Sequence, residues 1–182
     1  MNKSGIKPER TNGPKKWPQK VLVLENIRSV HNVGAIFRTA DAIGIDKIYL
    51  VGLTPSPIDR FGRARQDLHK ASLGAEKNVN WEHSSLENAS DLIKNLKKND
   101  FLTIALEQSK NAVDYKKVSE KIKNSKDIFK KVAVLVGNEI EGVSVAASEN
   151  VEIVSDIPMG GIKESLNVSV ATGIFLYRLF DF

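Results

Sequence analysis

The chain of 182 residues contains no cysteine. A disulfide framework, an iron–sulfur cluster, a cysteine-ligated zinc ion and a thiol nucleophile are therefore excluded. Histidine is also scarce, and its three positions lack the spacing of a metal-binding motif: His31, His69 and His83. We therefore expect no metal ion in the site.

Long apolar runs are absent as well. No stretch of about 18 apolar residues occurs and the N-terminus is polar, so the sequence predicts neither a membrane span nor a secretory signal. Hydrophobic residues make up 41% of the chain and charged residues 27%, values that are usual for a folded globular protein. The length favours one domain, and together these features predict a cytoplasmic protein.

Charge is distributed unevenly along the chain. The net charge is +5, and residues 1–20 contain six basic residues and one acidic residue, so the rest of the chain is neutral overall. Prolines and glycines interrupt the same stretch, which predicts a basic, flexible tail at residues 1–19 before a domain at residues 20–182. Such a tail either keeps a protein in solution or binds a polyanion such as RNA, for which Lys15 and Lys16 are candidate contacts.

Short apolar segments alternate with helical patterns after the tail. Strands are predicted at residues 21–24, 48–51, 78–81, 101–106, 132–136 and 151–154. Helices are predicted at residues 32–43, 66–73, 85–98, 143–149 and 165–180, and Gly44 is expected to end the first of them. This alternation predicts an α/β fold with a mostly parallel sheet and helices on both faces.

The first of three unusual loops leads into the first predicted helix. Ligands of open α/β sheets bind at the carboxyl ends of the strands, so the loops found there are the candidate sites. Asn32 is a candidate N-cap, Gly34 allows another backbone or a ligand to come close, and Arg38 lies on the same side of the helix. Apolar neighbours predict a poorly hydrated guanidinium that binds a phosphate or carboxylate, and a surface arginine is the alternative.

The second loop follows a buried strand and has two glycines five residues apart, Gly137 and Gly142. This spacing is similar to that of the phosphate-binding loop of nucleoside triphosphatases, but Val143 replaces the lysine that such a loop requires. Glu139 and Glu141 make the loop acidic, which suits a cationic ligand or an arginine. The alternative is a glycine turn with solvated carboxylates.

The third loop runs from Ile157 to Ser169 and is apolar where a loop is usually polar. Its first residues, from Ile157 to Met159, could form one wall of a slot for a flat aromatic group. Ser165 and Asn167 could cap the last helix or hold a ligand. No G-x-G-x-x-G follows the first strand, so an ordinary dinucleotide-binding turn is absent.

Together, the three loops resemble the motifs of the SPOUT superfamily, specifically those of the SpoU (TrmH-like) RNA ribose 2′-O-methyltransferases. The resemblance extends from about Val21 to Leu179. The first motif is matched by Asn32-x-Gly34-x-x-x-Arg38-Thr-Ala, the second by Gly137-Asn-Glu139-x-x-Gly142-Val-Ser, and the third by Ile157-Pro-Met with Ser165-Leu-Asn-Val-Ser.

This resemblance implies a SPOUT fold whose C-terminal segment forms a trefoil knot, a rare exception to unknotted topology. It implies that S-adenosylmethionine binds in the knot, against Leu106, Gly137, Ile157 and Leu166. The family is dimeric, and its active site combines the knot of one chain with the first-motif arginine of the other. A homodimer is therefore expected.

The resemblance also makes Arg38 the central catalytic residue. Four polar residues are expected to position this arginine, the cofactor or the ribose: Asn32, Glu139, Ser165 and Asn167. Accounts of the family describe the arginine as the general base for the 2′-hydroxyl. A guanidinium scarcely loses its proton, so the alternative is a clamp that stabilises negative charge on the oxygen.

RNA is the implied substrate, with tRNA favoured over rRNA. Its contacts are predicted in the basic segment after the second strand, at Arg60, Arg63, Arg65 and Lys70. Two alternatives from other classes stay open. One is a non-catalytic RNA-binding protein on the same fold, and the other is a SPOUT enzyme that methylates a base.

Overall fold

The computed structural model describes residues 19–84, 89–124 and 131–180. Its strands are β1 (Gln19–Glu25), β2 (Lys47–Val51), β3 (Asn80–Ser84), β4 (Leu102–Leu106), β5 (Val113–Asp114), β6 (Lys131–Val136) and β7 (Ile153–Asp156). Its helices are α1 (Val30–Ile43), α2 (Gln66–Ser72), α3 (Ser90–Lys98), α4 (Tyr115–Asn124), α5 (Val145–Ser148) and α6 (Val168–Phe180), with a short 3-10 helix at Ala75–Lys77.

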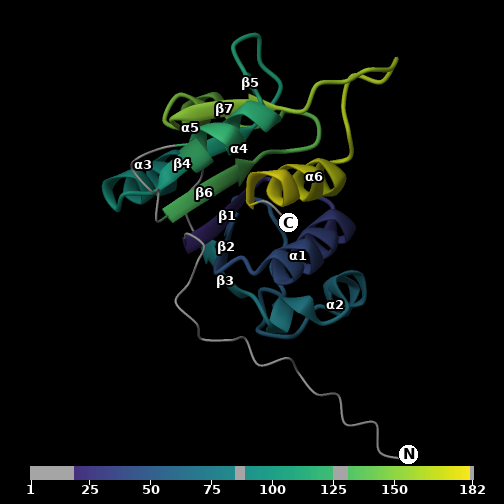
Figure 1. Cartoon of the computed structure of the whole chain (residues 1–182). Coiled ribbons are helices and arrows are strands. Elements are labelled where there is room, and N and C mark those ends of the chain that lie inside the picture. Colours follow the sequence, from purple (N-terminus) through teal and green to yellow (C-terminus); the bar gives the residue numbers. More distant parts are fainter. Residues whose placement is uncertain (1–18, 85–88, 125–130, 181–182) are drawn as a thin grey trace, which may run out of the picture.

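One sheet forms the centre of the protein. Its seven strands follow the order β3-β2-β1-β6-β4-β7-β5, and every pair of neighbouring strands is parallel. Helices lie on both faces of the sheet (Figure 1). The predicted α/β fold is therefore confirmed. The sheet order is consistent with the expected trefoil knot, which itself stays a prediction.

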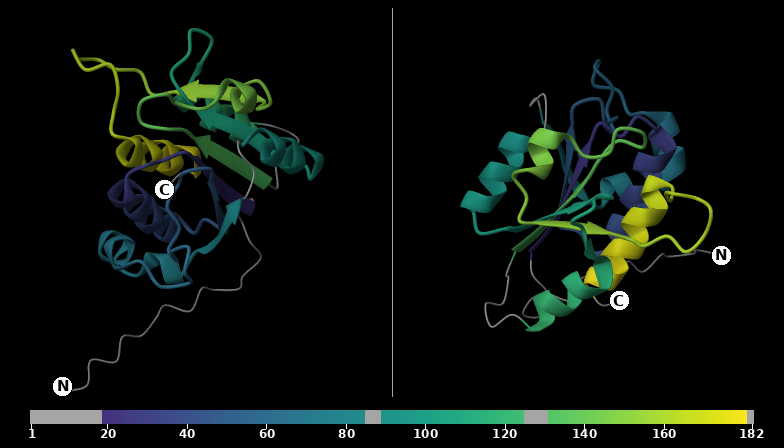
Figure 2. Two further views of the ribbon diagram at one scale, coloured as in Figure 1. Left: turned by 180° about the vertical axis from the view of Figure 1, so that it is seen from behind. Right: turned by 90° about the horizontal axis from the view of Figure 1, so that it is seen from above.

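The two faces of the sheet bury separate apolar clusters, because side chains alternate along each strand. In β1, Leu22 and Leu24 point to the face that α1, α4 and α6 cover, and Val21 and Val23 point to the face that α3 and α5 cover. Figure 2 shows the two helical layers on opposite sides of the sheet. Burial on both faces explains why β1 and β6 are continuous apolar runs.

The helix boundaries agree with the prediction at one end of α1 and differ at the other. Gly44 ends α1 in the left-handed conformation, with φ of +73°, as predicted. The helix begins at Val30 instead of Asn32, because Ser29 is the N-cap and its hydroxyl accepts a hydrogen bond from the Asn32 amide at 3.3 Å. The last helix, α6, begins three residues later than predicted, at Val168.

Gly34 allows α1 and α2 to pack closely. A Cβ at this position would lie 2.4 Å from the Cβ of Ala71 on α2. The close approach expected at Gly34 is therefore made by the backbone of α2 and not by a ligand. This contact fixes the segment after β2 against α1. The predicted tail falls almost entirely on residues 1–18, so Lys15 and Lys16 lie outside the described residues, and β1 already starts at Gln19.

Candidate active site

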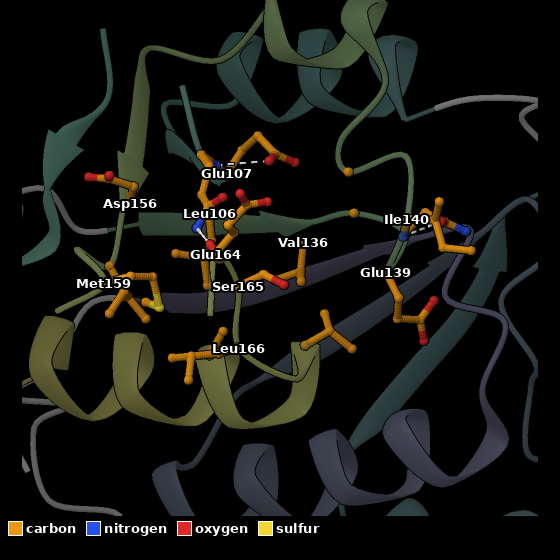
Figure 3. A pocket seen from close by; sticks show the side chains of 17 residues that line it. Leu106, Glu107, Val136, Glu139, Ile140, Asp156, Met159, Glu164, Ser165 and Leu166 are labelled. Carbon is orange, nitrogen blue, oxygen red and sulfur yellow. Dashed lines mark hydrogen bonds between the residues drawn. The ribbon is translucent and has the colours of Figure 1, made fainter. Parts of the chain in front are cut away.

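The second and third loops meet at one edge of the sheet, and Asn32 of the first motif, which lies in α1 and not in a loop, reaches them there. A cavity of about 310 Å³ opens there, between the carboxyl ends of β4, β6 and β7 and the start of α6 (Figure 3). This volume is near the lower limit for pockets that bind small molecules, about 300 Å³. The lining includes all four residues that the family resemblance implies for cofactor binding, Leu106, Gly137, Ile157 and Leu166.

The cavity combines apolar and acidic surfaces. Figure 3 shows Met159 and Glu139 at opposite ends of the site, with Leu106 and Leu166 between them. Four carboxylates are among the lining residues, Glu107, Glu139, Asp156 and Glu164. Apolar side chains suit a flat ring, and the carboxylates favour a ligand that carries positive charge or hydroxyl donors.

A chain of hydrogen bonds joins one residue from each loop. Nδ2 of Asn32 donates to Oε1 of Glu139 at 2.9 Å, and Nδ2 of Asn167 donates to Oδ1 of Asn32 at 3.1 Å. Asn32 is available for this because Ser29, and not Asn32, caps α1. Three of the predicted catalytic residues are thus in direct contact, although 107 and 135 positions separate the bonded pairs.

Glu139 is charged at neutral pH. Burial on its own would raise the pKa of this carboxyl, but hydrogen bonds from Asn32 and from nearby backbone amides lower the pKa below its ordinary value of 4.5. One of these amides, that of Arg28, lies 3.4 Å from Oε2. An ionised carboxylate only accepts hydrogen bonds, so it fixes the orientation of the Asn32 amide.

Asn167 caps α6 and belongs to the site at the same time. Its Oδ1 accepts hydrogen bonds from the amide and hydroxyl of Ser169, at 2.9 and 2.6 Å, and from the amide of Val170 at 3.4 Å. The capping role is therefore confirmed for Asn167, and its Nδ2 remains directed at Asn32. Ser165 precedes the helix, where it is exposed and lines the cavity.

A tight turn shapes the second loop. The backbones of Asn138 and Gly142 exchange hydrogen bonds of 2.9 and 3.0 Å, and Oδ1 of Asn138 accepts the amides of Ile140 and Glu141. Gly142 has φ of +71°, and a Cβ on Gly137 would lie 2.2 Å from the Gly142 backbone. Both glycines are therefore required by the turn itself.

Two glutamates that the sequence analysis did not select hold the end of this loop. Oε2 of Glu107 accepts the Val143 amide at 2.7 Å. Glu25, only 1% exposed, accepts the Ser144 amide at 3.0 Å and the Ser144 hydroxyl at 2.8 Å. Glu25 ends β1 and Glu107 follows β4, the two neighbours of β6. Their positions at strand ends are the signal that could have identified them.

Arg38 lies apart from the other predicted catalytic residues. It is exposed on α1 and does not line the cavity of its own chain, so the expected poorly hydrated environment is wrong for the single chain. Within the part of the chain that the structure describes, its guanidinium makes no hydrogen bond or ion pair. Helix α6 packs beside α1 and carries a line of exposed apolar side chains, Val170, Ile174 and Tyr177.

The predicted RNA contacts lie in and after the β2–α2 connection at residues 54–65, which we call the arginine loop. Two of its arginines form ion pairs, Arg63 with Asp59 at 2.9 Å and Arg65 with Asp67 at 2.7 Å. Arg60 and Lys70 are exposed. All four predicted residues are thus accessible at least in part, and they do not line the cavity.

Two further properties bear on the site. Among residues 19–84, 89–124 and 131–180, no group of three or more histidine, aspartate or glutamate side chains is arranged to hold a metal ion. None of the helices in these ranges combines the length and apolarity needed to cross a bilayer. The cytoplasmic location and the absence of a metal stay predictions.

A family model and curated relatives of similar sequence agree on one protein family. The model of the SpoU rRNA Methylase family matches residues 19–177, a region that contains all three loops. A "Putative TrmH family tRNA/rRNA methyltransferase" of Staphylococcus aureus (strain COL) is 32% identical over 160 residues, which are 88% of this chain and 58% of the relative. The chain therefore spans a little over half the length of this curated relative.

Solved structures of similar sequence share the fold. An AdoMet-bound rRNA methyltransferase from Sinorhizobium meliloti has 28% identity and a TM-score of 0.73, covering 90% of this chain and 57% of that one. A TrmH/SpoU tRNA modifying enzyme of A. aeolicus has 30% identity and a TM-score of 0.71, with coverage of 90% and 75%. An RNA 2′-O ribose methyltransferase has 26% identity and a TM-score of 0.69, with coverage of 94% and 60%.

Proposed function

Because the chain belongs to the SpoU rRNA methylase family, we propose that it transfers a methyl group from S-adenosylmethionine to the 2′-hydroxyl of a ribose in RNA. The observation that carries this proposal is the contact between Glu139, Asn32 and Asn167 beside an acidic and apolar cavity. A structural relative named as an RNA 2′-O ribose methyltransferase supports ribose as the target. Relatives are named both as a tRNA modifying enzyme and as an rRNA methyltransferase, and of these two RNA classes we propose tRNA as the substrate.

The residues of the cavity fit S-adenosylmethionine in their chemistry. Leu106, Ile157 and Leu166 provide apolar contact for the adenine ring, and backbone groups of the second loop can bind its edge. The carboxylates of Glu107 and Glu164 suit the ribose hydroxyls and the ammonium group. When bound, S-adenosylmethionine supplies a methyl group on a positively charged sulfur atom, and a solved relative is described as AdoMet bound.

In this proposal, Arg38 acts in the active site of the partner subunit. It is exposed and makes no ion pair within the described residues, and α6 beside it carries apolar side chains that a second copy of the chain would bury. The fork of five donors suits the phosphate next to the target ribose. We favour a clamp that stabilises the charge developing on the 2′-oxygen, because a guanidinium rarely gives up a proton.

The network of Asn32, Glu139 and Asn167 has a positioning role in the same scheme. The charged Glu139 orients the amide of Asn32, which in turn orients that of Asn167. These fixed amides and the Ser165 hydroxyl then hold the ribose, so that its 2′-oxygen takes the methyl group as the hydroxyl proton passes to water. Alignment of this kind supplies a large part of the acceleration in group transfer.

Mapping of 2′-O-methyl sites in RNA tests the reaction and its substrate. Purified protein with S-adenosylmethionine is incubated with the tRNA and rRNA fractions of cells that lack it, and the digested nucleosides are analysed. We expect one new 2′-O-methylnucleoside in the tRNA fraction. A methylated base would instead establish the base-methylating alternative. RNA binding without any affinity for S-adenosylmethionine would establish the non-catalytic one.

Mixed dimers test the placement of Arg38. Arg38→Ala and Glu139→Ala should each abolish activity, and subunit exchange between them should restore up to about one quarter of it, since about half of the dimers then hold one intact site. If the mixture stays inactive while the dimers exchange, Arg38 acts within its own chain.

A further inference from the structure

The arginine loop presents an aromatic ring to which the reaction above assigns no role. Phe61 is 66% exposed, so most of its surface remains open. The guanidinium carbons of Arg60 and Arg63 lie 4.8 and 5.0 Å from the ring centroid. Contacts of this length are cation–π interactions, and they join one apolar surface and two positive charges at a single place.

Hydrogen bonds within the loop hold the ring in place. Oδ1 of Asp59 accepts the amides of Phe61 and Arg63, at 2.8 and 2.9 Å. The Asp59 amide donates to the Arg63 carbonyl at 2.8 Å, and Gly62 supplies the left-handed residue of the turn, with φ of +78°. The loop thus has its shape before any ligand binds, which lowers the entropy cost of binding.

The guanidinium groups of Arg60 and Arg63 differ in whether an acidic side chain already pairs with them. Oδ2 of Asp59 pairs with both Nε and Nη2 of Arg63, at 3.0 and 2.9 Å, which fixes that guanidinium near the ring. The Arg63 amide and the other hydrogen bonds lower the pKa of Asp59 below 3.8, so the pair stays charged. Arg60 makes no ion pair in the described ranges, so its charge is available to a phosphate.

We propose that Phe61 is a stacking platform for an unpaired base of the RNA substrate, with Arg60 contacting an adjacent phosphate and Arg63 held beside the ring by Asp59. Proteins recognise single-stranded RNA by stacking its bases on aromatic side chains inside a positively charged surface. A base in a regular duplex is already stacked and cannot reach the ring. The RNA therefore offers a single-stranded segment to the arginine loop. This proposal depends on the proposed function only in that the substrate is RNA.

Binding of two RNA probes tests the stacking role. One probe is a labelled oligoadenylate of about 12 nucleotides, and the other is a fully paired hairpin of similar length. Wild-type protein should prefer the single strand. Phe61→Ala should weaken oligoadenylate binding by about fivefold or more and leave hairpin binding unchanged, and Phe61→Trp should retain wild-type affinity. The matched control is Leu53→Ala, at a 68% exposed apolar residue before the same loop, which should change neither affinity.

The salt dependence of RNA affinity separates the contribution of the Phe61 ring from that of the arginine charges. Phe61→Ala should leave the slope of log affinity against log salt unchanged, whereas Arg60→Gln should reduce it by about 0.7, the value for one phosphate contact on a single strand. Equal losses with both probes, no loss with either, or a wild-type protein without preference for the single strand would overturn the proposal. An altered association state with unchanged RNA binding would also overturn it, by assigning the ring to a protein contact.

Calorimetry with S-adenosylmethionine on the same variants keeps this proposal distinct from the proposed reaction. Every variant should bind the cofactor like the wild type, because Phe61 and Leu53 lie outside the cavity lining. If wild-type protein fails to bind S-adenosylmethionine, the proposed reaction fails. The two RNA probes still decide whether Phe61 contributes to the binding of single-stranded RNA.

Discussion

The second loop (residues 137–144) and the arginine loop differ in how much they depend on side chains from elsewhere in the chain. Asn138 within the second loop shapes its turn, but side chains from other elements hold the rest, with Glu25 and Glu107 binding the amides at its end and Asn32 binding its carboxylate. The arginine loop is held by its own Asp59. The shape of the cavity is therefore a property of the whole sheet edge, whereas the arginine loop is a local unit whose ring and charges can be changed separately.

The largest effect is expected from crowding of the second loop. In Gly137→Ala, the new Cβ would meet the backbone of Gly142 and Val143 at 2.2 Å, where neither neighbour can move without opening the turn. Overpacking of this kind costs about 2–3 kcal/mol, so the affinity for S-adenosylmethionine, measured by calorimetry, should fall by about 30- to 150-fold.

Gly160→Ala is the matched control for this prediction. Gly160 belongs to the third loop near the cavity, but a Cβ there has nothing within 4 Å. Its cofactor affinity should stay within about twofold of wild type, in line with the near-neutral effect of most surface substitutions. A comparable loss in both variants would show that loop flexibility, and not the tight turn, determines binding.

The next largest effect contrasts the two carboxylates that hold the loops. Glu25→Ala leaves the buried amide of Ala89 and the part-buried amide of Ser144 without an acceptor, each 3.0 Å from the carboxylate in the native protein, and should lower the free energy of unfolding by about 1–3 kcal/mol. Asp59→Ala removes as many hydrogen bonds to backbone, but water can replace them, so it should cost less than about 1 kcal/mol. Urea unfolding measures both. Equal costs would contradict the distinction between the loops.

The fold and the position of the site follow from local patterns in the sequence. Apolar strand segments, helical periodicity and Gly44 predict most of the elements, and the rule that ligands bind at carboxyl strand ends places the second and third loops at the cavity. The first motif lies in α1 and reaches the site through Asn32. The two-residue strand β5 is too short to show a period, so the sequence does not predict it.

Contacts that depend on strand order could not be predicted. Glu25 and Glu107 meet the second loop only because β1 and β4 flank β6, an order that no local pattern contains. The cap of α1 was ambiguous, since both Ser29 and Asn32 are residue types that cap helices. The apolar neighbours of Arg38 gave the wrong prediction that its guanidinium is poorly hydrated. Phe37 faces the core, but Arg38 is turned by about 100° around the helix from it and is exposed.

A smaller effect is expected for the charge of Glu139. Asn32→Ala removes a hydrogen bond of 2.9 Å to the carboxylate and should raise the pKa of Glu139 toward 4.5. Because the folded-state pKa is lowered, the carboxylate contributes stability above pH 4.5 that is lost as the pH falls through the folded pKa. The stability difference between wild type and variant should therefore shrink in acid.

Carboxyl NMR titration measures the pKa of Glu139 directly. Asn78→Ala is the control, since Asn78 donates a comparable 2.9 Å hydrogen bond to Asp41 away from the cavity. It should leave the pKa of Glu139 unchanged. An unchanged value in Asn32→Ala as well would mean that the backbone amides alone hold this carboxylate charged.

The smallest effect concerns the charge that the arginine loop offers to RNA. The hydrogen bond to Asp67 raises the pKa of Arg65, and Arg65 in turn lowers the pKa of Asp67, so both groups are charged and paired. Asp67→Asn keeps an oxygen for the Leu68 amide and frees the guanidinium. Affinity for oligoadenylate at low salt should rise by less than about fivefold, and the free energy of unfolding should change by less than about 1 kcal/mol, because exposed ion pairs contribute little.

Asp91→Asn separates a local effect from a change in net charge. Asp91 is also an exposed aspartate in the first turn of a helix and pairs with Lys94 at 3.4 Å, but it lies on α3, on the opposite face of the sheet. Asp91→Asn removes one negative charge from the protein, as Asp67→Asn does, but it does not change the arginine loop. If both variants bind oligoadenylate equally more tightly at low salt, the overall field of the protein accounts for the gain. A gain restricted to Asp67→Asn means that Arg65 itself reaches the RNA.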